Sequence, residues 1–135
     1  MVIFLDSCII IYWVESVDTF YEKVSKAILK LSKTYGRPNF AVSRLSVMEC
    51  RVHPLRAKDH DLLQLYEQFF SAPNLEIVDV SSDIIDTATA LRAHHQLKSI
   101  DAVLMASAIS LGKDTLFLSN DKQFKNLPFI KVKII

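Results

Sequence analysis

The chain has 135 residues and a formal net charge of +1, half of its residues are hydrophobic, and only two are glycine. This length predicts a single domain over residues 1–135, and the composition excludes a disordered chain and a glycine-rich phosphate loop. The longest apolar run, Cys8–Val14, is far shorter than the roughly 18 residues of a membrane-spanning helix. Because the apolar core begins at Val2 and the two cysteines lack C-x-x-C spacing, we expect a cytoplasmic protein with free thiols.

The first predicted element is a buried strand. Val2–Leu5 is an uninterrupted apolar run, typical of a strand buried on both faces in the middle of a parallel sheet. The Asp-Ser pair that follows is a good helix N-cap signal, so Cys8–Val14 is predicted to form a short buried helix. Between Val17 and Tyr35 the apolar positions recur every three or four residues with lysines between them, which indicates an amphipathic helix.

The middle of the chain predicts two further strands and two helices. Phe40–Val42 is a short strand candidate, and helical spacing follows it until Pro54 interrupts the pattern. A second amphipathic helix is predicted from about Lys58 to Phe70. The segment Leu75–Val80 alternates with a period of two at its start, which places this strand near an edge of the sheet.

The last third predicts two helices and two strands. Ser81 and Ser82 cap a helix that ends near Leu97, and a nearly uncharged, buried helix runs from Ser99 or Ile100 to Leu111. A second doubly buried strand, Thr115–Leu118, is followed by the last strand, Ile130–Ile135. Strands separated by helical segments predict an α/β fold, a parallel sheet of four to five strands with helices on both faces.

Four of the fifteen acidic residues follow or neighbour the predicted strands. Asp6 ends the first strand and Asp121 follows the fourth. Glu49 lies in the helix after the second strand, and Asp101 opens the buried helix. In open α/β sheets, ligands bind at the carboxyl ends of the strands. Carboxylates that converge there would repel one another, and a divalent cation is the usual remedy.

Each of these acids also has a purely structural explanation. Asp6 and Asp121 would cap the helical turns that follow them, Ser46–Glu49 matches the S-x-x-E capping box, and a helix macrodipole favours Asp101. This structural explanation is weaker for the four acids together than for each one alone, because two of them directly end apolar strands. A charge beside a buried helix is also costly unless it is paired or binds a metal.

The neighbouring side chains favour Mg²⁺ or Mn²⁺ over zinc, because hard cations prefer oxygen ligands. His94 and His95 are adjacent and so point to different faces of a helix, which does not suit a zinc site. Cys8 and Cys50 each neighbour a proposed ligand, and a thiolate site built on them is the minor alternative.

These motifs, in this order and spacing, resemble the PIN-domain ribonucleases, most closely the VapC-type toxins of toxin–antitoxin pairs. The resemblance spans essentially the whole chain and rests on four motifs: Phe4–Ser7, Glu49, Asp101–Ala106 and Phe117–Phe124. It implies a metal-dependent endoribonuclease that binds Mg²⁺ or Mn²⁺ in an acidic pocket, dimerises, and is inhibited by an antitoxin. One departure is Cys8, where many members carry asparagine.

Carried over by position, the resemblance assigns the catalytic and metal-binding acids to Asp6, Glu49, Asp101 and Asp121. Ser119 and Ser7 are the supporting hydroxyls. We expect Asp101 or Asp121 to accept a proton from the attacking water. An RNA substrate would be held as an unpaired loop, since a base-specific cut needs splayed bases.

The charge pattern suggests where RNA phosphates would bind. Arg44, Arg51, Arg56 and Lys58 stand against Glu49 alone, a local charge of +3. We expect Arg44, Arg51 and Lys122 to contact phosphates. A solvated helix face is the alternative interpretation of this segment.

Two other functions remain open from the sequence. The first is a non-catalytic nucleic-acid or protein binding module of the same fold, in which the acids are only helix caps. The second is a phosphohydrolase that uses Asp6 as nucleophile, but the haloacid-dehalogenase type needs an acid two residues later, and Cys8 stands there.

Overall fold

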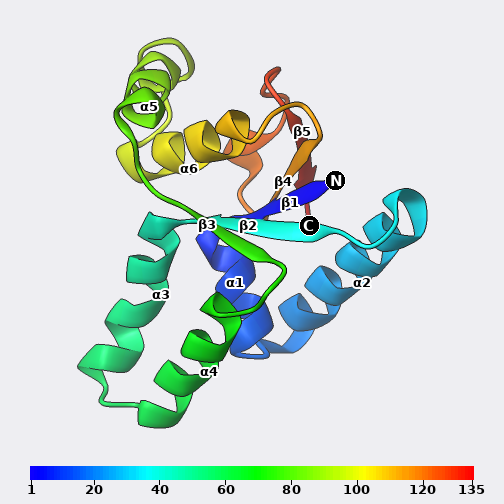
Figure 1. The fold of residues 1–135 in the computed structure, drawn as a ribbon, viewed down its shortest axis with the longest axis vertical. Helices are drawn as coiled ribbons and strands as arrows, with labels where there is room; N and C mark the ends of the chain where they lie inside the picture. Colours follow the sequence, from blue (N-terminus) through cyan, green and yellow to red (C-terminus); the bar gives the residue numbers. More distant parts are fainter.

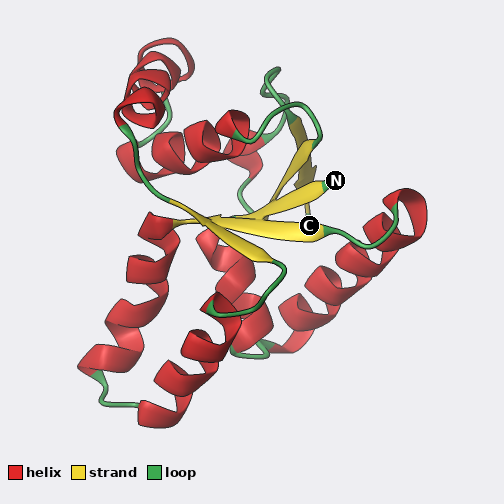
Figure 2. Cartoon of the chain, viewed as in Figure 1, coloured by secondary structure: helices red, strands yellow, loops and turns green.

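The computed structural model describes residues 1–135 and contains five strands, six α-helices and one 3₁₀ turn (Figure 2). The strands are β1 (Val2–Leu5), β2 (Asn39–Ser43), β3 (Leu75–Val78), β4 (Thr115–Ser119) and β5 (Lys131–Ile134). The α-helices are α1 (Ser7–Val14), α2 (Asp18–Tyr35), α3 (Arg44–Arg56), α4 (His60–Phe70), α5 (Ser82–His95) and α6 (Ser99–Ser110), and the 3₁₀ turn η1 is Lys122–Phe124.

The strands form one sheet in the order β3-β2-β1-β4-β5, and every neighbouring pair is parallel. Helices cover both faces (Figure 1). The predicted α/β class is therefore confirmed, and β3 lies at an edge as its alternating pattern predicted. In the register of β1 and β4, Leu5 pairs with Leu118, so the residues that follow the two strands come out side by side.

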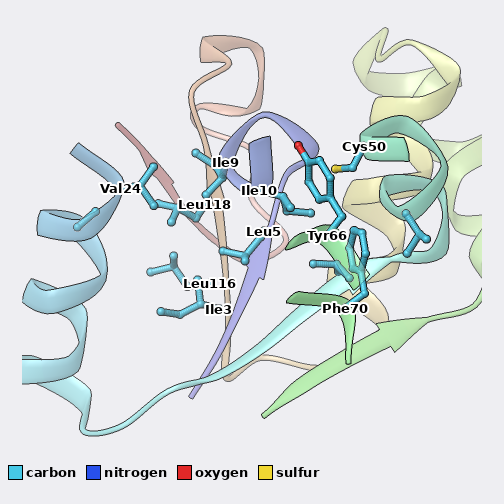
Figure 3. Close-up of a cluster of buried hydrophobic side chains, with 13 residues drawn as sticks. Ile3, Leu5, Ile9, Ile10, Val24, Cys50, Tyr66, Phe70, Leu116 and Leu118 are labelled. Carbon is cyan, nitrogen blue, oxygen red and sulfur yellow. The ribbon is translucent and has the colours of Figure 1, made fainter. Parts of the chain in front are cut away.

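Helices α1 to α4 pack on one face of the sheet. Alternate side chains of β1 and β4, such as Leu5 and Leu118, point to this face and contact Ile9 and Ile10 of α1 (Figure 3). Tyr66 of α4 is fully buried in the same cluster. This packing explains why the apolar run after Ser7 folds as a helix, because its side chains cover one face of the sheet that contains β1.

Helices α5 and α6 cover the opposite face, where Phe4 of β1 stacks on Phe117 of β4 with ring centroids 5.7 Å apart. Phe124 of η1 is fully buried against Phe117, at 4.8 Å. The residues from Ala102 to Ala108 are mostly buried, as the lack of charge in this segment predicted. None of the helices combines the length and the apolar character needed to cross a bilayer.

The predicted interruption at Pro54 is wrong. Helix α3 continues through Pro54, which is buried, and ends at Arg56. Proline removes only its own N–H from the helix, and here it lies in the last turn, so little of the helix remains to be disrupted. The carbonyl of Pro54 accepts a hydrogen bond from Asp59 N at 2.9 Å, and Lys58 adopts a left-handed conformation (φ 53°) that ends the segment.

Candidate active site

Asp6 lies directly after β1, and both oxygens of its carboxylate are occupied by hydrogen bonds. Its backbone N–H continues the sheet by donating to Leu118 O at 3.0 Å. Oδ1 accepts from the backbone N–H of Ser7 at 2.8 Å, and Oδ2 accepts from Ser119 Oγ at 2.6 Å. Only 7% of the residue is exposed. Asp6 is therefore the N-cap of α1 and also the partner of a hydroxyl at the end of the neighbouring strand.

Burial raises the pKa of the Asp6 carboxyl above its usual value of 3.8, and the negative charge of Asp101 raises it further. The hydrogen bonds from Ser119 and Ser7 act in the opposite direction. The ionised carboxylate of Asp6 thus sits where positive charge would stabilise it, and no lysine or arginine pairs with it.

Glu49 is linked to Asp6 through Ser7. Ser7 Oγ lies 2.7 Å from Glu49 Oε1 and 2.8 Å from Ser46 Oγ. Because the Ser7 hydroxyl has one proton, which the Glu49 carboxylate attracts, Ser46 is the donor to Ser7. Ser46 is completely buried. This short chain of hydroxyls fixes one carboxylate oxygen of Glu49 at the edge where Asp6 lies.

The capping-box explanation of Glu49 does not apply. The N-cap of α3 is Ser43, whose hydroxyl accepts from Leu45 N at 3.1 Å, so Ser46 and Glu49 both lie inside the helix. The carboxylate of Glu49 is free of any helix-capping hydrogen bond and is held by Ser7 instead.

Asp101 and Asp121 are joined by the side-chain amide of Gln123. The Gln123 Nε2 donates to Asp101 Oδ2 at 2.9 Å and to Asp121 Oδ2 at 2.6 Å. Asp121 also caps η1, because its Oδ1 accepts from the Gln123 backbone N–H at 3.0 Å. Its own N–H donates to Ser119 Oγ at 2.9 Å, which connects this pair to Asp6. Burial raises the pKa of Asp101, and the charge of Asp121 adds to that effect.

The four acids share one edge of the sheet, but no three histidine, cysteine or acidic side chains are gathered closely enough to hold an ion together. The amide of Gln123 lies between two of the carboxylates. The donor set itself, carboxylates and hydroxyls, has the chemistry of a Mg²⁺ or Mn²⁺ site. Mg²⁺ keeps several of its waters and needs only one or two protein carboxylates, so a closed cluster is not required.

The two cysteines do not provide a thiolate site. Burial, and then the charge of Asp6, raise the pKa of Cys8 to about 12. Burial, and then the charge of Glu49, raise the pKa of Cys50 to about 12. Both are therefore protonated thiols near neutral pH, and Cys8 donates a weak hydrogen bond to Asp6 Oδ2 at 3.6 Å.

The arginines predicted to bind phosphates are paired with acids. Arg44 Nε contacts Asp79 Oδ1 at 2.7 Å, and an Arg51 guanidinium nitrogen contacts Glu67 Oε2 at 3.0 Å. Lys122, in η1, is exposed and forms no ion pair. Of the three predicted phosphate contacts, only Lys122 combines a free charge with a place next to Asp121.

Sequence reasoning missed two residues of this arrangement. One is Gln123, and the other is Ser46, which contacts the hydroxyl of Ser7. The position of Gln123 two residues after Asp121, in a 3₁₀ turn, is what brings its amide back to the carboxylate. Ser46 lies one helical turn before Glu49 on the same face of α3. Both spacings are present in the sequence, but neither predicts the partner from a distant element.

Comparison with known proteins gives a family match and several similar structures. The family model described as PIN domain matches residues 3–130. No sequence relative was found among curated proteins. A structure of VapBC2 from Rickettsia felis, bound to a DNA fragment from its promoter, contains a chain with a TM-score of 0.77 and 18% identity, covering 99% of this chain and 98% of that one.

Two further structures have the same fold. A toxin–antitoxin complex from Klebsiella pneumoniae contains a chain with a TM-score of 0.72 and 22% identity, covering 98% of both chains. VapC20 of Mycobacterium tuberculosis, described as a toxin that cleaves the sarcin–ricin loop, has a TM-score of 0.63 and 15% identity, covering 85% of this chain and 86% of that one. At these identities the likeness shows the shared fold.

Proposed function

The chain belongs to the PIN-domain family, and from this premise we propose that it is a metal-dependent endoribonuclease, the toxin of a toxin–antitoxin pair. The observation that carries the proposal is the hydrogen bond between Asp6 and Ser119, which joins the ends of two central strands. Ser7 links Glu49 to this edge, Ser119 links Asp121 to it, and Gln123 links Asp101 to Asp121. Helix capping alone does not explain why hydrogen bonds link carboxylates from four separate segments.

The metal of this proposal is Mg²⁺ or Mn²⁺, held by the carboxylates of Asp6, Glu49, Asp101 and Asp121. When bound, such an ion lowers the pKa of a coordinated water and offsets the charge on the phosphate and the leaving oxygen. Ser119 orients one oxygen of Asp6, while Ser7 orients one oxygen of Glu49.

The proton of the attacking water would pass to Asp101. In the metal-free chain, burial and the charge of Asp121 raise the pKa of this carboxyl and so favour a proton on it. Gln123 donates to Oδ2 of the same carboxylate, so the amide would compete with a water or a metal at that oxygen. Lys122, one residue beyond Asp121, would contact a phosphate of the substrate.

The proposed substrate is RNA with unpaired bases, and the proposed partner is an antitoxin protein. Two structures of this fold contain toxin–antitoxin assemblies, and a third is of a toxin described as cleaving an RNA loop. A homodimer is part of the same proposal, by analogy with the family.

The test is an incubation of the purified protein with a pool of structured RNAs, in Mg²⁺, in Mn²⁺ and in EDTA. The proposal predicts discrete cleavage products that require the metal and disappear in EDTA. If the folded protein binds the RNA but produces no fragments with either metal, the molecule is a binding module and the enzymatic proposal is wrong.

A further inference from the structure

A groove lined with lysines lies where α2 passes the end of β5. The groove has a volume of about 390 Å³, and its lining includes Lys23, Lys26 and Lys30 of α2 and Lys133 of β5. Ala27, Ile134 and Ile135 form the apolar part of the lining, and no acidic side chain belongs to it. Figure 1 shows α2 passing beside the end of the chain that follows β5. Four positive charges thus face one concave surface.

These four lysines are free of ion pairs. The three salt bridges of the molecule join the N-terminus to Asp114, Arg44 to Asp79 and Arg51 to Glu67. Two arginines of α3, Arg44 and Arg51, are therefore partly neutralised, whereas the lysines of the α2–β5 groove have no acidic partner. A groove whose cations lack internal partners is suited to an anionic ligand from outside the chain.

The groove adjoins the acidic edge of the sheet. The backbone N–H of Ile135, at the end of the groove, donates to Ser119 O at 3.0 Å. On the other side, Asn120 Nδ2 donates to the hydroxyl of Tyr12 at 3.2 Å. Ile135, at the end of the groove, is thus hydrogen-bonded to Ser119, whose hydroxyl contacts Asp6.

Two aromatic rings connect Lys23 of α2 to this edge. Tyr12 of α1 stacks on Phe20 of α2, with ring centroids 4.3 Å apart, and the Lys23 ammonium lies 5.4 Å from the centroid of the Phe20 ring. Hydrogen bonding, stacking and a cation–π contact thus connect Asn120 to Lys23 in sequence. These contacts link Lys23, which lines the groove, to Asn120, the residue before Asp121.

We propose that the α2–β5 groove binds the phosphate backbone of the RNA strand on one side of the scissile bond. This inference rests on the proposed function and extends it, because it names the surface that holds the substrate. Lys23 and Lys30 are two turns apart on α2, so the lysines span about 10 Å, the length of a few nucleotides. The amines neutralise phosphates and carry no base recognition, so the groove adds affinity and not sequence preference.

The test measures RNA binding without cleavage, in the Asp6→Asn background. In this background Lys26, Lys30 and Lys133 are changed together to Gln, and affinity for a fluorescent single-stranded RNA is measured at several salt concentrations. Three lost phosphate contacts should make the slope of log affinity against log salt shallower by roughly 2, or about 0.7 for each lysine. Each single variant should show about a third of this change, which covers the case in which the triple variant does not fold.

Two matched variants serve as controls. Lys113→Gln removes an exposed lysine between α6 and β4, at the amino-terminal end of the strands, whereas the groove lies at the carboxyl-terminal end of β5. This variant should leave the salt slope unchanged. Arg51→Gln removes a charge that Glu67 already neutralises in part, so its effect should be smaller than that of any groove lysine.

The outcomes separate the groove from the catalytic proposal. A shallower slope in a protein whose wild type never cleaves RNA would support the groove and reject the enzyme. An unchanged slope for the triple variant, with or without cleavage by the wild type, would overturn the groove. If the lysine variants bind RNA normally but escape inhibition by the antitoxin, the groove is a docking site for an acidic protein segment and the RNA proposal is wrong.

Discussion

Asp6 is a buried carboxylate with no cation beside it, and this has a consequence for stability. Its pKa in the folded chain is raised above 3.8, chiefly by burial. An acid whose pKa is higher in the folded state keeps its proton longer than in the unfolded chain. Without metal, the free energy of unfolding therefore falls as pH rises from about 3.8 through the folded pKa.

We predict that Asp6→Asn, in metal-free buffer, is more stable than the wild type near neutral pH. The advantage should shrink as the pH falls toward 3.8, where the wild-type carboxyl becomes protonated in both states. Urea unfolding at a series of pH values measures this. Asp86→Asn, an exposed acid of α5, is the control and should show no such trend. A wild type that is more stable than Asp6→Asn at every pH would mean that the Asp6 charge is not costly.

At the scale of elements, Gln123 is the only polar side chain of η1 that forms a hydrogen bond with α6. The amide donates to Oδ2 of Asp101 in α6 and to Oδ2 of Asp121. A metal ion that binds through these two oxygens would have to replace the amide. The turn therefore competes with the metal for the same oxygens.

We predict that Gln123→Ala is less stable than the wild type without metal, by about 1 kcal/mol, since two hydrogen bonds to carboxylates are lost. The rise in melting temperature caused by Mg²⁺ should be larger in this variant, because the ion no longer displaces the amide. Thermal melts with and without Mg²⁺ measure both effects. Gln64→Ala, on the exposed face of α4, is the control. An identical Mg²⁺ response in Gln123→Ala and wild type would show that the amide does not compete.

At the scale of the whole molecule, most of the architecture was predictable. Uninterrupted apolar runs predicted the two central strands, and alternation placed β3 at an edge. The lack of charge between Ala102 and Ala108 predicted the buried helix α6. These predictions succeed because each kind of burial leaves its own pattern in the sequence. A strand buried on both faces is apolar throughout, a strand buried on one face alternates, and a buried helix lacks charge all round.

The contacts of long polar side chains were less predictable. Arg44 and Arg51 form a basic segment in the sequence, but their partners Asp79 and Glu67 come from other elements. The lysines of α2 resemble an ordinary solvated face until β5 is placed beside them. Pairings of this kind depend on the order of the strands, which local patterns do not encode.

The candidate site was likewise predictable only in part. The convergence of Asp6 and the segment after β4 follows from two adjacent parallel strands, and the Asp6–Ser119 distance of 2.6 Å agrees with it. The amide of Gln123 between two acids does not follow from any pattern, because a rotamer choice in a short turn decides it. The metal-binding role of the four acids stays a prediction.

The measurement that tests the central claim most directly is the rate of RNA cleavage as a function of Mg²⁺ concentration for wild type and Asp6→Asn. The substitution keeps the size and the capping ability of the side chain and removes its charge. We predict saturable activation of the wild type and a rate lower by orders of magnitude for Asp6→Asn at every Mg²⁺ concentration, with the fold retained. Cleavage by Asp6→Asn at the wild-type rate under saturating Mg²⁺ would contradict the assignment of this edge as the catalytic metal site.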